Sequence, residues 1–340
     1  MKNIKKFFLF LCCSLLLLSL VPISASALIF SDGDFGFELN TYAKYATLVE
    51  YTGTDSVVDI PSEYSGYPVK KISQKAFMNN SSVEEVRFPT TISSLDTRSF
   101  MNCTSLKKID LPAYISELGQ ELFANCSSLE HVGIYTETVP VRCFAGCTAL
   151  SEIYFSDYVN SIRDYAFQDC SSLTDLSLSS SITSLGSHSF EGTGIQELLI
   201  PDGITNIPDY AFANCSNLEK VTINQNVTYI SSVAFKNDSL LIIYCYYDSY
   251  AYNYAIVNNN SYALLDGVKL GDVNNDNAVN VNDATYIQGY LAELENLDGI
   301  YLHAADANED GEVDISDATA IQMYSAEYQS GHPIGQVMTK

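Results

Sequence analysis

Two segments near the C-terminal end carry oxygen-bearing side chains at matched spacing. Residues 272–294 and 306–328 are identical at 12 of 23 aligned positions, which indicates an internal duplication. In both segments these side chains occupy relative positions 1, 3, 5, 9 and 12: Asp272, Asn274, Asp276, Asn280 and Asp283, and then Asp306, Asn308, Asp310, Asp314 and Asp317. Calcium is a hard cation that takes about six to eight such oxygens as ligands. The spacing therefore predicts two Ca2+ sites.

The rest of each loop fits the same interpretation. A 12-residue loop of the EF-hand type also uses the main-chain carbonyl at position 7, which here belongs to Ala278 and Glu312. Position 6 must turn sharply, and it is Asn277 in the first loop and Gly311 in the second. The alternative is a pair of acidic loops at helix N-termini, where carboxylates are favourable without a metal. Ten matched ligands favour calcium, and the second loop, with four carboxylates against three, is expected to bind it more tightly.

Each loop leads into a segment with apolar residues at helical spacing: Ala284, Ile287 and Leu291, and then Ala318, Ile321 and Tyr324. Residues 266–340 are therefore expected to form a small all-α module of two calcium loop-helix units. The Asp at position 12, the single loop and helix per half and the duplication resemble type I dockerins over residues 270–330. The resemblance implies that the module needs calcium to fold and binds a cohesin module of a scaffolding protein, as in cellulosome-like complexes of anaerobic bacteria.

The same resemblance implies which residues contact the cohesin. In dockerins, loop positions 10 and 11 and positions on the following helix make this contact. The corresponding residues are Val281, Asn282, Gln288 and Gly289 in the first half, and Ile315, Ser316, Gln322 and Met323 in the second. The Ser-Thr and Lys-Arg pairs familiar in that family are absent here, so the resemblance does not specify which cohesin is bound.

A repeat of about 23 residues occupies the middle of the chain. Its anchors are eight phenylalanines, separated by 23, 23, 21, 23, 23, 22 and 23 residues: Phe77, Phe100, Phe123, Phe144, Phe167, Phe190, Phe212 and Phe235. Each unit combines a turn-like half with a short strand of alternating apolar residues, such as residues 106–111 or 218–223. One unit cannot bury its own apolar residues, so the units must stack.

Stacked units at the inter-strand spacing of about 4.8 Å form a parallel sheet and a continuous core. The expected fold class for residues 71–240 is an α/β repeat, a right-handed curved solenoid of eight units. The pairs Ala76-Phe77 and Ala166-Phe167, and motifs such as residues 125–129, resemble the BspA-like (treponemal) class of bacterial leucine-rich repeats. The 21-residue unit before Phe144 departs from that pattern and suggests a shortened turn.

The ends of a solenoid need protection, because a bare terminal coil exposes apolar surface and an open sheet edge. Residues 28–70, with a hairpin-like stretch, are expected to form the N-terminal cap. Residues 241–265, rich in tyrosine, are expected to form the C-terminal cap. Carbohydrate stacking on those tyrosines is the alternative role.

Seven cysteines lie outside the N-terminal apolar run, and five of them follow an anchor phenylalanine by three residues: Cys103, Cys126, Cys147, Cys170 and Cys215. A position locked to one phase of the repeat points inward, so these residues are interpreted as a buried ladder rather than as disulfides. Cys143 and Cys147 are close enough in sequence for a bridge, which the sequence leaves open.

The N-terminal residues have the pattern of a secretory signal peptide. Lys2, Lys5 and Lys6 precede an apolar run over residues 7–21 and a small-residue site at residues 25–27. Cleavage after Ala27 changes the formal charge from −24 to −27, because three lysines are lost. The chain is therefore expected to be secreted, without direct membrane insertion and without nucleic acid as a partner. It is expected to reach a cell surface only through a scaffold.

A possible ligand face follows from the strands. One non-core residue per unit falls between core residues, and these residues differ from unit to unit: Arg87, Asp110, Gly133, Tyr154, Ser177, Leu199 and Thr222. Such a row is often the ligand surface of a solenoid, and a solvated surface without a ligand is the alternative. A protein ligand is favoured over a glycan because the chain has no Trp.

The sequence has no zinc-protease motif and no nucleophile elbow, and it leaves a pair of glycosidase carboxylates open. The four histidines are scattered, and Ser187-His188-Ser189 is not a nucleophile elbow. We therefore expect a secreted, non-catalytic interaction protein. The alternative is an accessory or enzymatic component of polysaccharide degradation, acting through glycoside hydrolysis or carbohydrate binding.

Overall fold

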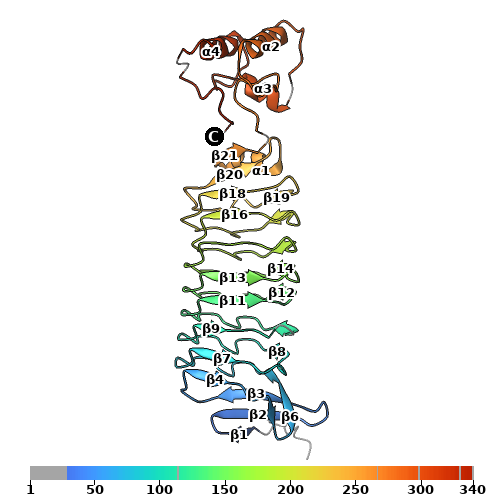
Figure 1. The fold of residues 1–340 in the computed structure, drawn as a ribbon, viewed down its shortest axis with the longest axis vertical. Coiled ribbons are helices and arrows are strands. Elements are labelled where there is room, and N and C mark those ends of the chain that lie inside the picture. Colours follow the sequence, from blue (N-terminus) through green and yellow to red (C-terminus); the bar gives the residue numbers. More distant parts are fainter. Residues whose placement is uncertain (1–28, 113–114, 266, 298, 329–330, 339–340) are drawn as a thin grey trace, which may run out of the picture.

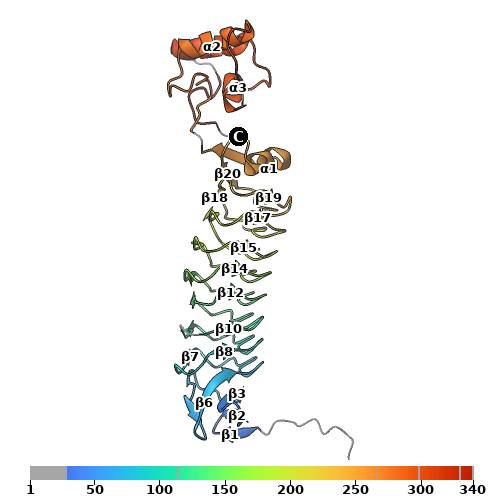
Figure 2. The same ribbon diagram turned by 90° about the vertical axis from the view of Figure 1, so that its right-hand side faces the viewer.

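The computed structural model describes residues 29–112, 115–265, 267–297, 299–328 and 331–338. The signal peptide predicted for residues 1–27 lies outside the described residues. Figures 1 and 2 show short strands stacked into one elongated column, with a small helical module beyond its C-terminal end. The predicted parallel-sheet solenoid followed by helices is confirmed.

Antiparallel strands form the N-terminal end of the column. Strands β1 (Phe30–Asp32), β2 (Phe35–Asn40) and β3 (Tyr45–Tyr51) pair in sequence order. Strand β3 then pairs in parallel with β6 (Tyr67–Ile72), and β5 (Glu63–Tyr64) pairs with β6 in the antiparallel direction. This end therefore passes from a meander to the parallel stacking of the repeats.

Most coils of the repeat contribute two short strands, which stack into two columns of parallel strands (Figure 1). The first column contains β4 (Val57–Asp59), β7 (Glu85–Arg87), β9 (Lys108–Ile109), β11 (His131–Ile134), β13 (Glu152–Phe155), β16 (Glu197–Leu199), β18 (Lys220–Thr222), β20 (Ile242–Cys245) and β21 (Ser261–Leu264). Between β13 and β16, the coil contributes a single bridge from Asp175 to Glu197.

The second column contains β6 and shorter strands: β8 (Ser94–Leu95), β10 (Glu117–Leu118), β12 (Thr138–Val139), β14 (Ser161–Ile162), β15 (Ser184–Leu185), β17 (Asn206–Ile207) and β19 (Tyr229–Ile230). The sequence predicted one strand per unit. The second strand was missed because two residues are too few for a period-2 alternation to be visible.

The anchor phenylalanines form a continuous ladder inside the column. Their rings stack on one another with centroids 4.8 to 5.7 Å apart, and none is more than 3% exposed. Tyr51 extends the ladder by one ring at the N-terminal end, 4.9 Å from Phe77. The ladder explains the period, because each coil must place one ring above the ring of the coil before it.

The phase-locked cysteines form a second buried ladder. Each thiol lies against the carbonyl of the anchor phenylalanine one coil earlier; the distance from Cys103 Sγ to Phe77 O is 3.1 Å. Cys143 and Cys147 are both free thiols, so they do not bridge. Burial raises the pKa of the Cys143 and Cys170 thiols, which keeps them protonated and unreactive.

The 21-residue unit is two residues shorter than a 23-residue unit because the connection from its first-column strand to its second-column strand is shorter. Strands β11 and β12 are joined by residues 135–137 alone. Core residues Ile134 and Val139 are five apart there, against seven for Leu111 and Leu118 in the preceding unit. The turn with the phenylalanine keeps its length, so the ladder continues without a break.

Helix α1 (Tyr250–Asn258) packs against β19, β20 and β21 at the C-terminal end of the column. Ser249 caps it by accepting a hydrogen bond from the Tyr252 N–H. Beyond it lie α2 (Val281–Leu291), α3 (Gly299–Ala305) and α4 (Ile315–Ser325). Helix α3 was not predicted; it starts at a glycine and is too short to show a helical period.

The helical module has its own core and also contacts the column. Helices α2 and α4 pack together around a separate buried cluster that includes Ala284, Ile287, Ala318 and Ile321. Near the junction, the Leu264 N–H donates to the Met338 carbonyl and the Gly335 N–H donates to the Leu270 carbonyl. Leu270 and Met338 belong to the same buried cluster as the repeats, so the module is packed onto the C-terminal end.

Within the described residues, no helix combines the length and apolarity that a membrane crossing requires.

Candidate metal centre and binding surfaces

The first loop (residues 272–283) is organised around a buried carboxylate. Asp283 is fully buried at the first turn of α2 and accepts the N–H groups of Val273 and Asn280, each at 2.9 Å. At the other end of the loop, Asp272 is 1% exposed and accepts the Asp276 N–H at 3.1 Å. The carboxylates at positions 1 and 12 are thus turned inward, toward the backbone of their own loop.

The second loop (residues 306–317) repeats this arrangement. Asp317 is fully buried and accepts the N–H groups of Asn308 at 3.0 Å and Asp314 at 2.9 Å. Asp306 accepts the N–H groups of Asp310 and Gly311 at 3.0 and 2.9 Å. The two loops therefore have the same pattern of internal hydrogen bonds as well as similar sequences.

Position 6 turns as expected in both loops. Asn277 and Gly311 have φ angles of 64° and 91°, in the left-handed region that asparagine and glycine tolerate best. The following residues, Ala278 and Glu312, donate their N–H groups to the carboxylates at position 5, Asp276 and Asp310. The main chain at position 7 is therefore held beside the acidic side chains.

Position 9 has a second role that the sequence analysis missed. Asn280 and Asp314 are the N-caps of α2 and α4, and each forms a capping box with the aspartate at position 12. Hydrogen bonds from Ser316 lower the pKa of the Asp314 carboxyl group. The pattern Asn-x-x-Asp or Asp-x-x-Asp before an apolar helix was the available signal.

Electrostatics in both loops favour a bound cation. The pKa of Asp272 is raised by burial and by repulsion from Asp283 and Asp276. The pKa of Asp317 is raised by burial and by repulsion from Asp306 and Asp310. No lysine or arginine in the described residues forms an ion pair with these carboxylates. A divalent cation would replace this repulsion with attraction.

The donor set suits calcium and no softer metal. Among the described residues, no group of three or more His, Cys, Asp or Glu side chains is placed so that it could hold a metal ion. Each loop also brings asparagine side chains and main-chain carbonyls, which calcium accepts as ligands. The Asn274 and Asn308 amides lie 3.1 and 3.0 Å from the carboxylates at position 5. The residues present therefore fit a hard cation held by mixed oxygen ligands.

The residues implied to contact a cohesin lie around the two capped helices. Val281 and Ile315, the first residues of α2 and α4, are 55% and 59% exposed, and Met323 is 41% exposed. Asn282, Gln288, Ser316 and Gln322 are exposed, and Gly289 is partly exposed. Ser316 is also bonded within its loop, because the Asn308 amide donates to its hydroxyl at 2.7 Å. An exposed apolar side chain is thus the first residue of each of the two helices.

Of the apolar residues predicted at helical spacing, only some are buried. Ala284, Ile287, Ala318 and Ile321 lie in the core, but Leu291 and Tyr324 are 41% and 40% exposed. These two residues therefore add apolar surface near the ends of α2 and α4.

The predicted ligand-face residues lie on the outward side of the first strand column, which we call the repeat face. Tyr154 and Leu199 are 59% and 66% exposed, Arg87 and Asp110 are exposed and Thr222 is partly exposed. Residues on either side of each, such as Ile153 and Phe155, pack toward the core. The structure therefore aligns these five residues along one surface.

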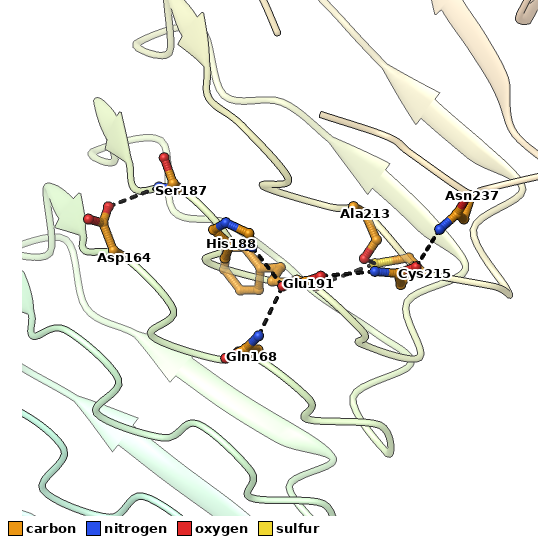
Figure 3. Close-up of polar contacts among 10 residues, drawn as sticks. Asp164, Gln168, Ser187, His188, Glu191, Ala213, Cys215 and Asn237 are labelled. Atoms are coloured by element: carbon orange, nitrogen blue, oxygen red, sulfur yellow. Dashed lines mark hydrogen bonds and ion pairs between the residues drawn. The ribbon is translucent and has the colours of Figure 1, made fainter. Parts of the chain in front are cut away.

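His188 is held in a structural network rather than in a catalytic one. Its ring stacks between Tyr165 and Tyr210, with centroids 4.5 and 4.7 Å away. Figure 3 shows two hydrogen bonds to the Glu191 carboxylate, one from His188 Nδ1 at 2.7 Å and one from the Gln168 side-chain amide at 2.9 Å. The neighbouring serine, Ser187, contacts Asp164 through its main-chain N–H. These contacts cross-link successive coils.

Comparisons with known families agree with both parts of the chain. The model described as "BspA type Leucine rich repeat region" matches residues 58–139 and 137–262, and the model "Dockerin type I domain" matches residues 270–324. Type I dockerins typically bind calcium, dockerins bind cohesin modules in general, and neither type of module is itself catalytic. The search of curated proteins found no match.

Several solved structures are similar to the chain. A leucine-rich cell surface protein from Faecalibacterium prausnitzii is 24% identical, with a TM-score of 0.46, over 65% of this chain and 76% of that one. A leucine-rich repeat protein from Bacteroides ovatus is 24% identical, with a TM-score of 0.47, over 64% and 70%. Because the repeat model covers more than half of the sequence, this chain belongs to the BspA-type leucine-rich repeat family, and it carries a type I dockerin domain at its C-terminal end.

Proposed function

We propose that this chain is a secreted, non-catalytic interaction protein that docks through its C-terminal module onto a cohesin-bearing scaffold. The observation that carries the proposal is the pair of matched loops, each with an inward carboxylate at position 12 and a capped helix directly after it. Docking places the protein outside the cell, and the N-terminal pattern of the sequence supports export.

Each loop would hold one calcium ion. The ligands would be Asp272, Asn274, Asp276, Ala278 O, Asn280 and Asp283 in the first loop, and Asp306, Asn308, Asp310, Glu312 O, Asp314 and Asp317 in the second. When bound, calcium supplies the positive charge that lets these carboxylates lie together. The chain's own contribution is to fix the ends of α2 and α4, because position 12 lies in the first turn of each helix.

A cohesin would contact exposed side chains at the first residues of α2 and α4 and further along these helices. Val281 and Ile315 present apolar surface, and exposed Met323 extends it. Apolar side chains surrounded by polar ones, such as Asn282 and Ser316, are the usual composition of a protein interface. Because α2 and α4 pack against each other, both halves of the module belong to one rigid unit.

The repeats would present a separate surface to a protein or cell-surface ligand. The repeat face carries exposed residues that differ from coil to coil, whereas the buried ladders repeat one chemistry. Variation on a regular scaffold is the property that solenoids use for recognition. The protein would thus link a scaffold at one end to a ligand along its side.

The two calcium sites are expected to differ in affinity. The second loop has one more carboxylate, and Lys269 Nζ donates to the Asn277 carbonyl of the first loop at 2.7 Å, which places a positive charge beside that site. Both features favour the second site.

Isothermal titration calorimetry of the wild type should count two calcium ions. The site that remains in Asp272→Ala should bind calcium about tenfold more tightly than the site that remains in Asp306→Ala. Lys269→Met should reduce the difference in calcium affinity between the two sites. Lys236→Met, which removes a lysine from the repeats, is the matched control. A single ion in the wild type, or the opposite order of affinities, would contradict the assignment.

A further inference from the structure

The repeat face divides into two parts with different charge balance. At its N-terminal part, the charges are paired on the surface. Arg87 lies 2.9 Å from Glu85 and 3.7 Å from Asp59, and Lys108 lies 3.2 Å from Asp110. This part of the face is close to neutral, and its charged side chains already have partners.

The part from β11 to β16 is acidic, and on its outward positions in the described residues one ion pair is present, between Glu197 and Lys220 of the next strand. Its outward positions include Glu152, Asp175 and Glu197, and all three are exposed. Only two lysines or arginines, Arg142 and Arg163, occur between residues 109 and 219, and neither lies on a strand of the first column. The next cation on the face is Lys220 on β18, 3.5 Å from Glu197.

Like charges are adjacent on this part of the face. Asp175 and Glu197 are direct partners in the parallel bridge between neighbouring coils. Like charges at opposed positions of a sheet destabilise it. Lys220 lies on the other side of Glu197, so Asp175 is the carboxylate of this pair for which the described residues give no ion pair, and a cationic ligand would supply one.

Exposed aromatic and apolar side chains lie on the same strands. Tyr154 is 59% exposed and Leu199 is 66% exposed. Tyr135, 36% exposed, follows β11 and lies with its ring centroid 6.0 Å from that of Tyr154. Gly133 makes room for it, since a Cβ on that glycine would lie only 2.9 Å from the Tyr135 hydroxyl. The shortened unit thus places two tyrosine rings side by side.

We propose that this acidic-aromatic patch binds a segment of a partner protein that is rich in arginine or lysine. We define the patch by Tyr135, Glu152, Tyr154, Asp175, Glu197 and Leu199. Carboxylates attract such a segment, and the exposed faces of tyrosine rings receive its cations. The chain uses the same pairing internally, because Arg142 lies 4.3 Å from the Tyr165 ring centroid and Lys220 lies 5.1 Å from that of Tyr244.

This inference rests on the proposal that the repeats bind a protein, and it names the chemistry of that partner. It does not depend on the cohesin contact, which involves the helical module beyond the C-terminal end of the column, whereas β11 and β13 lie midway along the column (Figure 1).

The test uses the full-length secreted chain and a fluorescein-labelled peptide of five Arg-Gly repeats, with binding followed by fluorescence anisotropy. We expect saturable binding that weakens with added salt. Tyr154→Ala and Asp175→Asn should each weaken it about fivefold or more. These side chains are exposed, so the variants should fold, and circular dichroism checks this.

Two matched controls separate the patch from general attraction to an acidic protein. Tyr42→Ala removes a tyrosine that is 98% exposed in the turn between β2 and β3, and Asp202→Asn removes an exposed carboxylate outside the patch. Neither should change the affinity by as much as twofold. Equal effects of the control and patch variants would overturn the patch assignment and leave protein binding by the repeats intact. No binding by the wild type, or equal binding of a Glu-Gly peptide, would overturn the cationic partner, whereas cohesin capture by the same preparation would be unaffected.

Discussion

Asp238 illustrates how a single residue departs from a regular pattern. It occupies the cysteine phase in the last coil, where it is 6% exposed. Its Oδ1 accepts the Cys215 N–H at 2.8 Å, and its Oδ2 has no hydrogen-bond partner among the described residues. Burial raises the pKa of this carboxyl group from 3.8 to about 7. In the first coil, Asn80 occupies the same position of the repeat, and its neutral side-chain amide forms hydrogen bonds both as a donor and as an acceptor.

The raised pKa makes stability depend on pH in a defined direction. The folded chain holds this proton more tightly than the unfolded chain, so the stabilisation is complete below pH 4 and is lost as the pH rises to about 7. The loss amounts to no more than about 4 kcal/mol of the free energy of unfolding. Asp238→Asn keeps the shape and removes the charge.

We therefore predict that Asp238→Asn raises the free energy of unfolding by about 2 kcal/mol or more at pH 8 and changes it little at pH 4.5. Urea denaturation at the two pH values measures this, and the exposed Asp202→Asn serves as the control. Equal changes at both pH values would show that folding does not raise the pKa of Asp238.

Other residue-level features were accessible from spacing alone. The oxygen side chains of the two loops and the left-handed position 6 could be identified because their order is a chemical requirement of a small loop. The burial of Asp238 could not be identified in that way. It depends on helix α1 covering the last coil, where Tyr254 is 7% exposed and packs edge-on against Phe235.

At the scale of elements, the phenylalanine ladder stabilises each coil through its neighbours. Phe144 is fully buried between Phe123 and Phe167, with ring centroids 5.4 and 5.3 Å away. A large-to-small change there loses transfer energy, leaves a cavity and removes two ring contacts.

We predict that Phe144→Ala lowers the free energy of unfolding by about 3–5 kcal/mol. Phe144→Leu should cost less than half as much, because it fills most of the space. Urea denaturation followed by circular dichroism provides the measurement, with the exposed Tyr158→Ala as the control. A cost for Phe144→Ala no larger than that of the control would mean that the ladder does not carry the stability of the repeats.

Elements with a clear period were predictable, and short ones were not. The strands of the first column alternate in burial, as in Glu85, Val86 and Arg87, and that alternation is visible in the sequence. The second-column strands have only two residues, and helix α1 is rich in tyrosine, which favours strands. Their conformations are set by stacking on the preceding coil and not by local sequence.

At the scale of the whole molecule, the repeats and the dockerin domain form a linked pair with different roles. The column offers a long side surface, and the dockerin domain packs on its C-terminal end through Leu270 and Met338. This packing could not be inferred from the sequence, because it joins residues on either side of the duplicated loops.

The central claim is calcium-dependent docking to a cohesin-bearing scaffold. The most direct measurement is a pull-down with the tagged, full-length secreted chain from the secretome of its own organism, with calcium and with chelator, followed by mass spectrometry of the bound chains. We expect a cohesin-bearing protein to be recovered with calcium and lost with chelator or with the Asp272→Ala/Asp306→Ala double variant. Recovery of no such protein while the calorimeter shows calcium bound, or equal recovery with chelator, would contradict it.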